Sequence, residues 1–206
     1  MRLMVVGQKW LGAEVLRLCL EHGHDVAAVA AQGIGDRLYL AAVEAGLPAS
    51  VCEQALAPDA VPDGTEVIVA AHAHCFIPAD ARARSKFGAL GYHPSLLPRH
   101  RGRDAVRWVV HIGERVTGGT VYWMTDKADA GPIAAQDWCL VRPGDTPAEL
   151  WRRDLAPMGL RLFGKVLGDL AAGRVVATCQ DEALATWEPA FKRPSLAGFT
   201  PLKPSP

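Results

Sequence analysis

The sequence lacks the features that define several large classes of proteins. Its 22 lysine and arginine residues balance 22 aspartate and glutamate residues, so it has no excess of positive charge to follow a nucleic-acid backbone. No apolar run reaches the length of a membrane span. The 5 cysteines are widely spaced and include no C-x-x-C pair, which argues against a disulfide framework. We therefore expect a cytoplasmic protein that binds neither nucleic acid nor a membrane.

Two ligand-binding signatures are missing as well. The turn after the first apolar run contains Gly7 and Gly12 but not the G-x-G-x-x-G spacing, so a nicotinamide dinucleotide is not expected. His72, His74 and Cys75 are close neighbours along the chain, but no second pair of ligands accompanies them. A zinc site at these residues is the weaker alternative, and the sequence predicts no bound metal.

What the chain does contain is a regular alternation of strand-like and helix-like segments. Half of its residues are hydrophobic, which is enough for a buried core. The alternation predicts an α/β fold with parallel strand pairs, in which the two strands around residue 130 pair antiparallel. Strands are predicted at 2–6, 25–31, 65–71, 89–92, 117–124, 133–141 and 175–179. Helices are predicted between the first two strands and at 36–45, 79–86, 103–113 and 148–172.

The composition of the chain changes near residue 180. From Glu182 onward proline becomes frequent, and the alternation of strands and helices stops. A segment of this composition either lies extended on the domain or projects from it. We therefore predict one domain over residues 1–180 and a proline-rich carboxyl-terminal extension over residues 181–206.

Polar side chains gather where the predicted strands end. His72 and His74 follow one strand, His93 follows the next, and Asp126 and Asp129 follow the strand after that. Ligands and chemistry in open α/β sheets lie at the ends of strands, so we expect these side chains to lie close together. A carboxylate can orient an imidazole and support it as an acid or base. Taken singly, each residue also fits a structural reading, as a loop histidine or as an aspartate that caps a turn.

The combination of motifs is more specific than any one of these residues. The motifs are His93-Pro94-Ser95-Leu96-Leu97-Pro98, Arg101-Gly102, Thr117-Gly118-Gly119-Thr120 and Asp129-Ala130-Gly131. Together they resemble the formyltransferases that use 10-formyltetrahydrofolate, in particular the amino-terminal hydrolase domain of 10-formyltetrahydrofolate dehydrogenase. The resemblance covers roughly residues 1–180. It implies a Rossmann-like open, mostly parallel sheet with helices on both faces and an active site at the strand ends.

The resemblance also implies roles for individual residues. His93 matches the catalytic histidine that stabilises a tetrahedral oxyanion, and Asp129 matches the catalytic aspartate that holds this histidine and helps to remove a proton. The co-substrate would be 10-formyltetrahydrofolate, and no metal would take part. The folate would be bound largely through backbone groups of Ala71, His72, Ala73, His74, Cys75, Phe76, Gly91, Lys127 and Ala128.

The sequence departs from the family pattern at residue 91. The transferases have an asparagine there that donates a hydrogen bond to the formyl oxygen, whereas Gly91 has no side chain. Loss of one such donor typically lowers the rate by about 100-fold or more. The hydrolase domain of the dehydrogenase also lacks this asparagine. Three functions therefore stay open: formyl transfer to a small amine, hydrolysis to tetrahydrofolate and formate, and a non-catalytic folate-binding or regulatory role. Assembly into a homo-oligomer also stays open.

Overall fold

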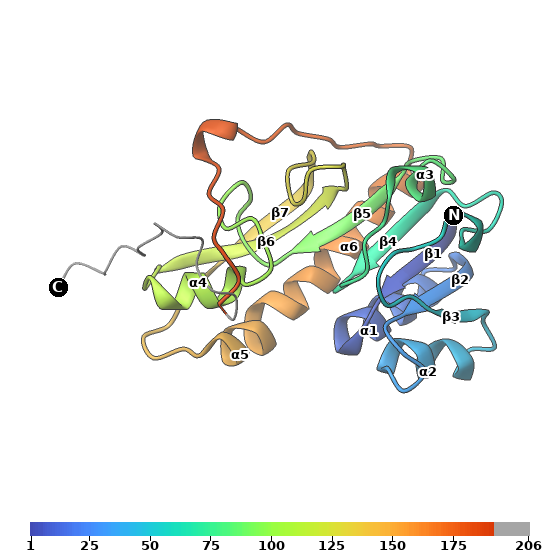
Figure 1. Ribbon diagram of the computed structural model, residues 1–206, viewed down its shortest axis with the longest axis horizontal. Coiled ribbons are helices and arrows are strands. Elements are labelled where there is room, and N and C mark those ends of the chain that lie inside the picture. Colours follow the sequence, from blue (N-terminus) through green and yellow to red (C-terminus); the bar gives the residue numbers. More distant parts are fainter. Residues whose placement is uncertain (192–206) are drawn as a thin grey trace.

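The computed structural model describes residues 1–191, and residues 192–206 of the predicted proline-rich extension lie outside the described part. A 7-stranded sheet with the order β3-β2-β1-β4-β5-β6-β7 forms its centre (Figure 1). The strands are β1 (Arg2–Gly7), β2 (Asp25–Ala31), β3 (Ala49–Val51), β4 (Val67–Ala71), β5 (Ala89–His93), β6 (Val116–Trp123) and β7 (Ile133–Leu140). Neighbours from β3 to β5 are parallel, and β6 and β7 are antiparallel. The prediction of a mostly parallel open sheet is confirmed.

Helices lie on both faces of the sheet, as the sequence predicts. One face carries α1 (Lys9–Glu21), α2 (Arg37–Glu44) and α6 (Ala156–Ala171), which enclose the larger hydrophobic core (Figure 1). The opposite face carries a smaller core that is covered by α3 (Ala79–Arg82) and the 3₁₀ turn Pro58–Ala60. Two further helices, α4 (Ala105–His111) and α5 (Pro147–Leu150), contact each other beside a third, smaller cluster.

Strand β4 shows why the apolar runs of this chain become central strands. It lies between β1 and β5, and each of its residues is buried. Val67, Val69 and Ala71 contribute to the larger core, whereas Ile68 and Ala70 contribute to the smaller core on the other face. A strand that is covered on both faces needs apolar residues at every position, which explains the unbroken run Val-Ile-Val-Ala-Ala.

Several predicted elements differ from the structure. The strand predicted at 175–179 is wrong, because only an isolated bridge joins Thr178 to Ile133. The short edge strand β3 was not predicted, and the helix predicted at 79–86 ends at Arg82. The helix predicted at 148–172 is divided by a π-helical turn, Trp151–Leu155, between α5 and α6. Pro157 is the second residue of the helix after this turn and cannot donate a backbone hydrogen bond back into the turn, which accounts for the irregularity.

Within residues 1–191, no helix has both the length and the apolar character that a membrane crossing requires.

Candidate active site

His93 is the last residue of β5 and is only 6% exposed. Its Nε2 atom lies 2.6 Å from the backbone oxygen of His100. A carbonyl oxygen can only accept, so Nε2 must carry the proton of this hydrogen bond. The other ring nitrogen, Nδ1, is therefore the one that is free to exchange a proton or to donate to a bound group.

Asp129 lies on the loop between β6 and β7 and is the carboxylate that faces His93. Its Oδ1 atom is 3.6 Å from Nδ1 of His93, which is too long for a direct hydrogen bond but within the distance of an ion pair when the imidazole is protonated. The hydroxyl of Tyr122 donates to the same Oδ1 at 2.8 Å, and the backbone N–H of Gly102 donates to Oδ2 at 2.8 Å. The carboxylate is thus fixed on two sides beside the imidazole.

The sequence predicts that these residues meet, but not the way in which they do so. Strand β6 runs antiparallel to β5, with His93 opposite Thr120 and Gly91 opposite Tyr122. The loop after β6 therefore begins beside the amino-terminal end of β5, whereas His93 lies at the carboxyl-terminal end of β5. It reaches His93 only by folding back across the face that carries the side chains of His93 and Tyr122, which brings Asp129 over that face. The site is built on this face of β5 and β6 and not at one shared edge.

Backbone strain is concentrated around the strand ends. Among residues 1–191, the non-glycine residues with positive φ are Lys9 at 58°, His72 at 56°, His100 at 55° and Asp129 at 53°. They follow β1, β4, β5 and β6. Such conformations typically cost on the order of 1 kcal/mol or more and gather at functional sites. Two of these residues provide the groups that face the two ring nitrogens of His93: the backbone oxygen of His100 and the carboxylate of Asp129.

The loop after β4 contains most of the residues that the resemblance assigns to the folate. Ala71 and Cys75 are buried in the core on opposite faces of the sheet, whereas Phe76 is 54% exposed. Gly91 is buried in the middle of β5. Lys127 and Ala128, on the loop that carries Asp129, are exposed. The assigned positions thus comprise exposed loop residues together with buried residues that hold those loops in place.

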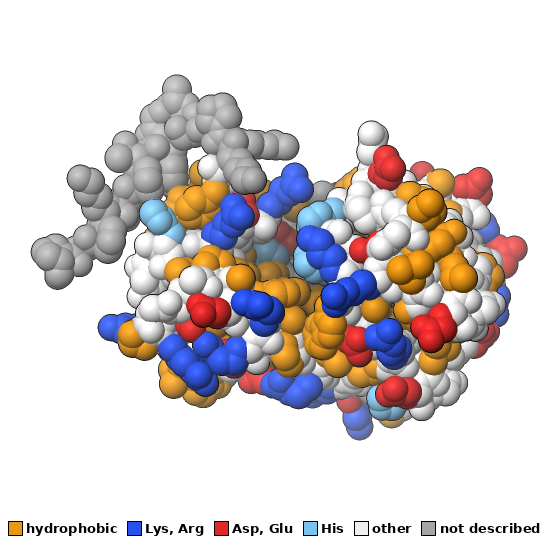
Figure 2. Space-filling model, turned by 90° about the horizontal axis from the view of Figure 1, so that it is seen from below, with side chains coloured by type: hydrophobic (Ala, Val, Ile, Leu, Met, Phe, Trp, Pro, Cys, Tyr) orange, Lys and Arg blue, Asp and Glu red, His pale blue; other side chains and the backbone are white. Residues whose placement is uncertain are grey.

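His72 lies within an aromatic cluster beside this loop. Its ring contacts the ring of Trp151 edge-on at 5.1 Å and the ring of His74 at 5.5 Å. Burial, together with the nearby Lys9 cation, lowers the pKa of His72 to about 4. Burial and Lys9 also lower the pKa of His74. Both imidazoles are therefore neutral at pH 7 and can offer apolar ring faces to a ligand. Figure 2 shows histidine, lysine and arginine side chains around a hollow on one face of the molecule.

Asp126 does not join the site. Its side chain is 80% exposed and pairs with Arg82 of α3. The weaker zinc alternative also finds no support, since no three His, Cys, Asp or Glu side chains within residues 1–191 are grouped to hold a metal ion.

The sequence did not identify Gln180, which holds the Asp129 loop from a distant part of the chain. Its Nε2 atom donates to the backbone oxygens of Asp129 at 2.9 Å and Gly131 at 2.7 Å. Its Oε1 atom accepts from the guanidinium of Arg101 at 2.7 Å. Gln180 therefore joins the loop of Asp129 to the loop that follows His93. No local sequence pattern indicates this contact, because its partners lie about 50 residues away.

Residues 180–189, here called the C-terminal strap, cross the loop after β5. Thr186 Oγ1 accepts from the N–H of His100 at 2.7 Å, and the oxygen of Thr186 accepts from the N–H of Arg101 at 3.0 Å. The indole of Trp108 donates to the oxygen of Pro189 at 2.9 Å. Where the structure describes it, the predicted extension thus lies on the domain and holds the loop that carries the acceptor for His93.

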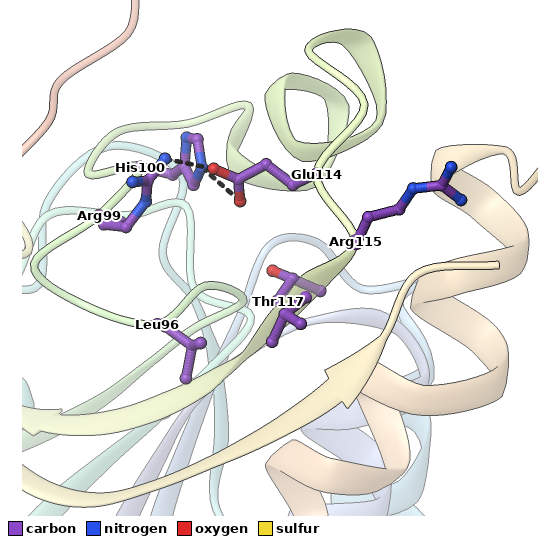
Figure 3. Close-up of a pocket in the computed structure, with 7 residues that line it drawn as sticks. Leu96, Arg99, His100, Glu114, Arg115 and Thr117 are labelled. Atoms are coloured by element: carbon purple, nitrogen blue, oxygen red, sulfur yellow. Dashed lines mark hydrogen bonds and ion pairs between the residues drawn. The ribbon is translucent and has the colours of Figure 1, made fainter. Parts of the chain in front are cut away.

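The strap also encloses the imidazole of His100, which is 2% exposed. Its Nδ1 atom lies 3.0 Å from Oε1 of Glu188 on the strap, and its Nε2 atom lies 3.1 Å from Oε2 of Glu114. Figure 3 shows Glu114 reaching toward both His100 and Arg99 beside a pocket of about 420 Å³, whose lining does not include His93 or Asp129. Burial by itself lowers the pKa of His100, but the hydrogen bonds and negative charges of Glu114 and Glu188 have the larger combined effect and raise this pKa to about 9.

This cluster predicts a pH dependence of stability. The pKa of His100 rises from 6.5 to about 9 in the folded protein, so its stabilisation is complete below pH 6.5 and is lost as pH increases through 9. We expect the free energy of unfolding to fall by roughly 2–3 kcal/mol over this interval. Urea titrations at intermediate pH values measure it. Glu188→Gln should flatten the dependence, Glu53→Gln on an exposed loop should not, and an equal slope in all variants would contradict the assignment.

Comparison with known proteins shows the family of this chain. Residues 39–158 match the formyl transferase family. The chain is 36% identical over 203 residues to mouse mitochondrial 10-formyltetrahydrofolate dehydrogenase, covering 91% of this chain and 22% of that protein. It is 34% identical over 215 residues to methionyl-tRNA formyltransferase of Acidobacterium capsulatum, covering 94% and 67% of the two chains. The chain therefore belongs to the formyl transferase family, and the resemblance seen in the sequence is confirmed.

Solved structures agree at the level of the fold. An N-formyltransferase of Helicobacter canadensis, in complex with folinic acid and dTDP-3-aminofucose, has a TM-score of 0.76 at 16% identity, covering 90% of this chain and 70% of that one. His93 and Asp129 both lie within the stretch that matches the family. The chain spans only about a fifth of the length of the dehydrogenases that it matches.

Proposed function

We propose that this protein takes the formyl group from 10-formyltetrahydrofolate and transfers it to a small amine. The observation that carries the proposal is the buried pair of His93 and Asp129, with Nδ1 and Oδ1 3.6 Å apart, inside the stretch that matches the family. The names of the relatives support the choice of donor, since 10-formyltetrahydrofolate dehydrogenases are among them. The folinic acid in the Helicobacter structure gives the same support.

The pterin would lie against the loop of residues 71–76 and the loop of residues 127–129. The exposed members of these loops, such as Phe76 and Lys127, offer the surface, and the buried members fix the backbone. The neutral ring of His72, held against Trp151, adds an apolar wall without a competing charge. This placement brings the reacting end of the folate toward His93.

The reaction forms one carbon–nitrogen bond and breaks another. The amine nitrogen attacks the formyl carbon, and the carbonyl oxygen becomes a tetrahedral oxyanion. His93 would donate to this oxyanion from Nδ1, because Nε2 already donates to the oxygen of His100. Asp129 would stabilise the imidazolium and take the proton that the amine loses, directly or through water. The bond from the carbon to N10 then breaks and N10 gains a proton, which leaves a formamide and tetrahydrofolate.

Hydrolysis is the second candidate, and Gly91 is the observation that favours it. A residue without a side chain offers the oxyanion no extra donor, and water is small enough to attack at the same carbon. The products would be formate and tetrahydrofolate. The similarity to dehydrogenases that act on 10-formyltetrahydrofolate is consistent with this outcome.

The experiment that separates these functions uses the formyl-labelled co-substrate. Purified protein is incubated with 10-[¹⁴C]formyltetrahydrofolate, with and without a panel of small amines, and the label is recovered as formamide or formate. Label in a formamide supports transfer, and label in formate that does not depend on the amine supports hydrolysis. Folate binding without release of the label would contradict both and would leave a binding or regulatory role.

Gly91→Asn is expected to lower the rate of formyl release and not to raise it. A Cβ atom at residue 91 would lie 3.0–3.2 Å from the ring and hydroxyl of Tyr122, so an asparagine side chain cannot enter without displacing that ring. The loss should be about 10-fold or more, since a shift of even 1 Å near reacting groups has effects of this size. Steady-state assays of tetrahydrofolate formation measure it, and a rate above wild type would show that the space is open.

A further inference from the structure

Tyr122 is a buried polar group next to His93 that the steps above do not use. It lies on β6 directly opposite Gly91 of β5, and only 6% of it is exposed. Its hydroxyl donates to Oδ1 of Asp129 at 2.8 Å, the same oxygen that faces Nδ1 of His93. One carboxylate oxygen thus accepts the hydrogen bond of the phenol and also faces the imidazole.

Gly91 makes room for this arrangement. A Cβ atom at residue 91 would lie 3.0 Å from Cε1, 3.1 Å from Cζ and 3.2 Å from the hydroxyl oxygen of Tyr122. Contacts this short require the neighbouring group to move. The phenol ring therefore occupies the volume that a side chain at residue 91 would need, and glycine lets the hydroxyl reach Asp129 without a shift of the ring.

The phenol is a donor under all ordinary conditions. Burial, together with the adjacent carboxylate of Asp129, raises the pKa of Tyr122 well above its usual value. A hydroxyl that keeps its proton can donate to the carboxylate of Asp129 at any ordinary pH. The same bond limits the orientations of Asp129, whose backbone is already held at a φ of 53°.

We propose that Tyr122 is a positioning residue for formyl release. Its hydroxyl holds Oδ1 of Asp129 aimed at Nδ1 of His93, and Gly91 is the small residue that leaves room for this placement. The inference rests on the proposed function, because it assigns a role in the same reaction. It also explains why residue 91 is a glycine, which the sequence alone does not. The space that a side chain at residue 91 would fill is occupied by the phenol ring of Tyr122 from the neighbouring strand.

The first test compares Tyr122→Phe with Tyr92→Phe. Both tyrosines are largely buried and hydrogen-bonded, but the hydroxyl of Tyr92 donates to the backbone oxygen of Leu155 at 2.6 Å and does not touch Asp129. We expect Tyr122→Phe to lower kcat about 10-fold to 100-fold with KM within about twofold, since it removes an orienting contact and no substrate contact. Tyr92→Phe should keep the wild-type kcat. Equal kcat values for Tyr122→Phe and wild type would overturn the proposal.

A second substitution, on the strand that pairs with Tyr122, supplies a readout that a merely structural role would not move. Gly91→Ala should lower kcat in the wild type and have a smaller effect in Tyr122→Phe, because both substitutions act through one hydroxyl. Additive losses would contradict that coupling.

A measurement without turnover keeps this inference separate from the proposed function. A crystal structure of Tyr122→Phe should show Oδ1 of Asp129 displaced from the position that it holds 3.6 Å from Nδ1 of His93. If wild-type protein releases no formyl group but the carboxylate moves in the variant, the proposed reaction fails while the role of Tyr122 in holding Asp129 stands. If the carboxylate does not move, the positioning role fails whatever the activity.

Discussion

Replacing His93 with glutamine is expected to reduce formyl release from 10-formyltetrahydrofolate by about 10²-fold to 10⁴-fold while the fold is kept. The amide nitrogen of glutamine can take the place of Nε2 and continue to donate to the oxygen of His100, which His93 contacts at 2.6 Å. What glutamine lacks is a proton-carrying group at the position of Nδ1, 3.6 Å from Asp129. The substitution thus removes the proposed chemistry and preserves the structural hydrogen bond.

His93→Asn provides the complementary test, because its amide reaches the position of Nδ1 but not that of Nε2. It should keep some stabilisation of the oxyanion and lose part of the loop anchor. His22→Gln is a suitable control, since His22 is an exposed residue at the end of α1 whose Nδ1 atom lies 2.8 Å from a backbone oxygen. Rates of tetrahydrofolate formation and thermal melting curves measure these effects. Wild-type rates in both His93 variants would contradict the mechanism.

Replacing Asp129 with asparagine is expected to lower the rate by about 10²-fold to 10⁴-fold, again with the fold kept. Asparagine is one of the few residues that tolerate a left-handed backbone, so it can adopt the φ of 53° found here. Its side-chain oxygen can still accept one of the hydrogen bonds that Tyr122 and Gly102 donate. The negative charge beside His93, and the capacity to take a proton from the amine, are lost.

Asp126→Asn is the matched control for this prediction. Asp126 lies on the same loop, but its carboxylate is 80% exposed and pairs with Arg82. The loss of an exposed ion pair typically costs about 1 kcal/mol or less, so activity and melting temperature should stay close to wild type. Asp129→Ala is less informative, because it adds backbone strain and leaves the Tyr122 hydroxyl without its acceptor. Equal activity in Asp129→Asn and Asp126→Asn would show that Asp129 has no special role.

The central position of β4 follows from a pattern that is local in sequence. The unbroken apolar run of β4 identifies a strand covered on both faces, and the structure places it at the centre of the sheet. The weaker elements depend on tertiary contacts. Strand β3 has only 3 residues, and the segment near Thr178 resembles a strand but forms only an isolated bridge. The apolar residues of these short segments do not show whether a segment pairs with a neighbouring strand of the sheet.

The site shows the same division. His93 and Asp129 belong to recognisable motifs, and the structure places them together. Tyr122 and Gln180 carry no motif, because each acts through a partner that is brought near only by the fold. Gly91 appears in the sequence as a missing donor. The structure shows that the space beside it is filled by the ring of Tyr122, which no pattern along the chain could indicate.

The most direct test of the account is the rate at which the purified wild-type protein forms tetrahydrofolate from 10-formyltetrahydrofolate, followed by absorbance beside His93→Gln and Asp129→Asn. We predict steady turnover by the wild type, with or without a dependence on added amine, and a loss of about 10²-fold or more in each variant. Binding of the folate with no turnover by the wild type, or equal turnover by all three proteins, would contradict the claim that His93 and Asp129 form a formyl-releasing pair.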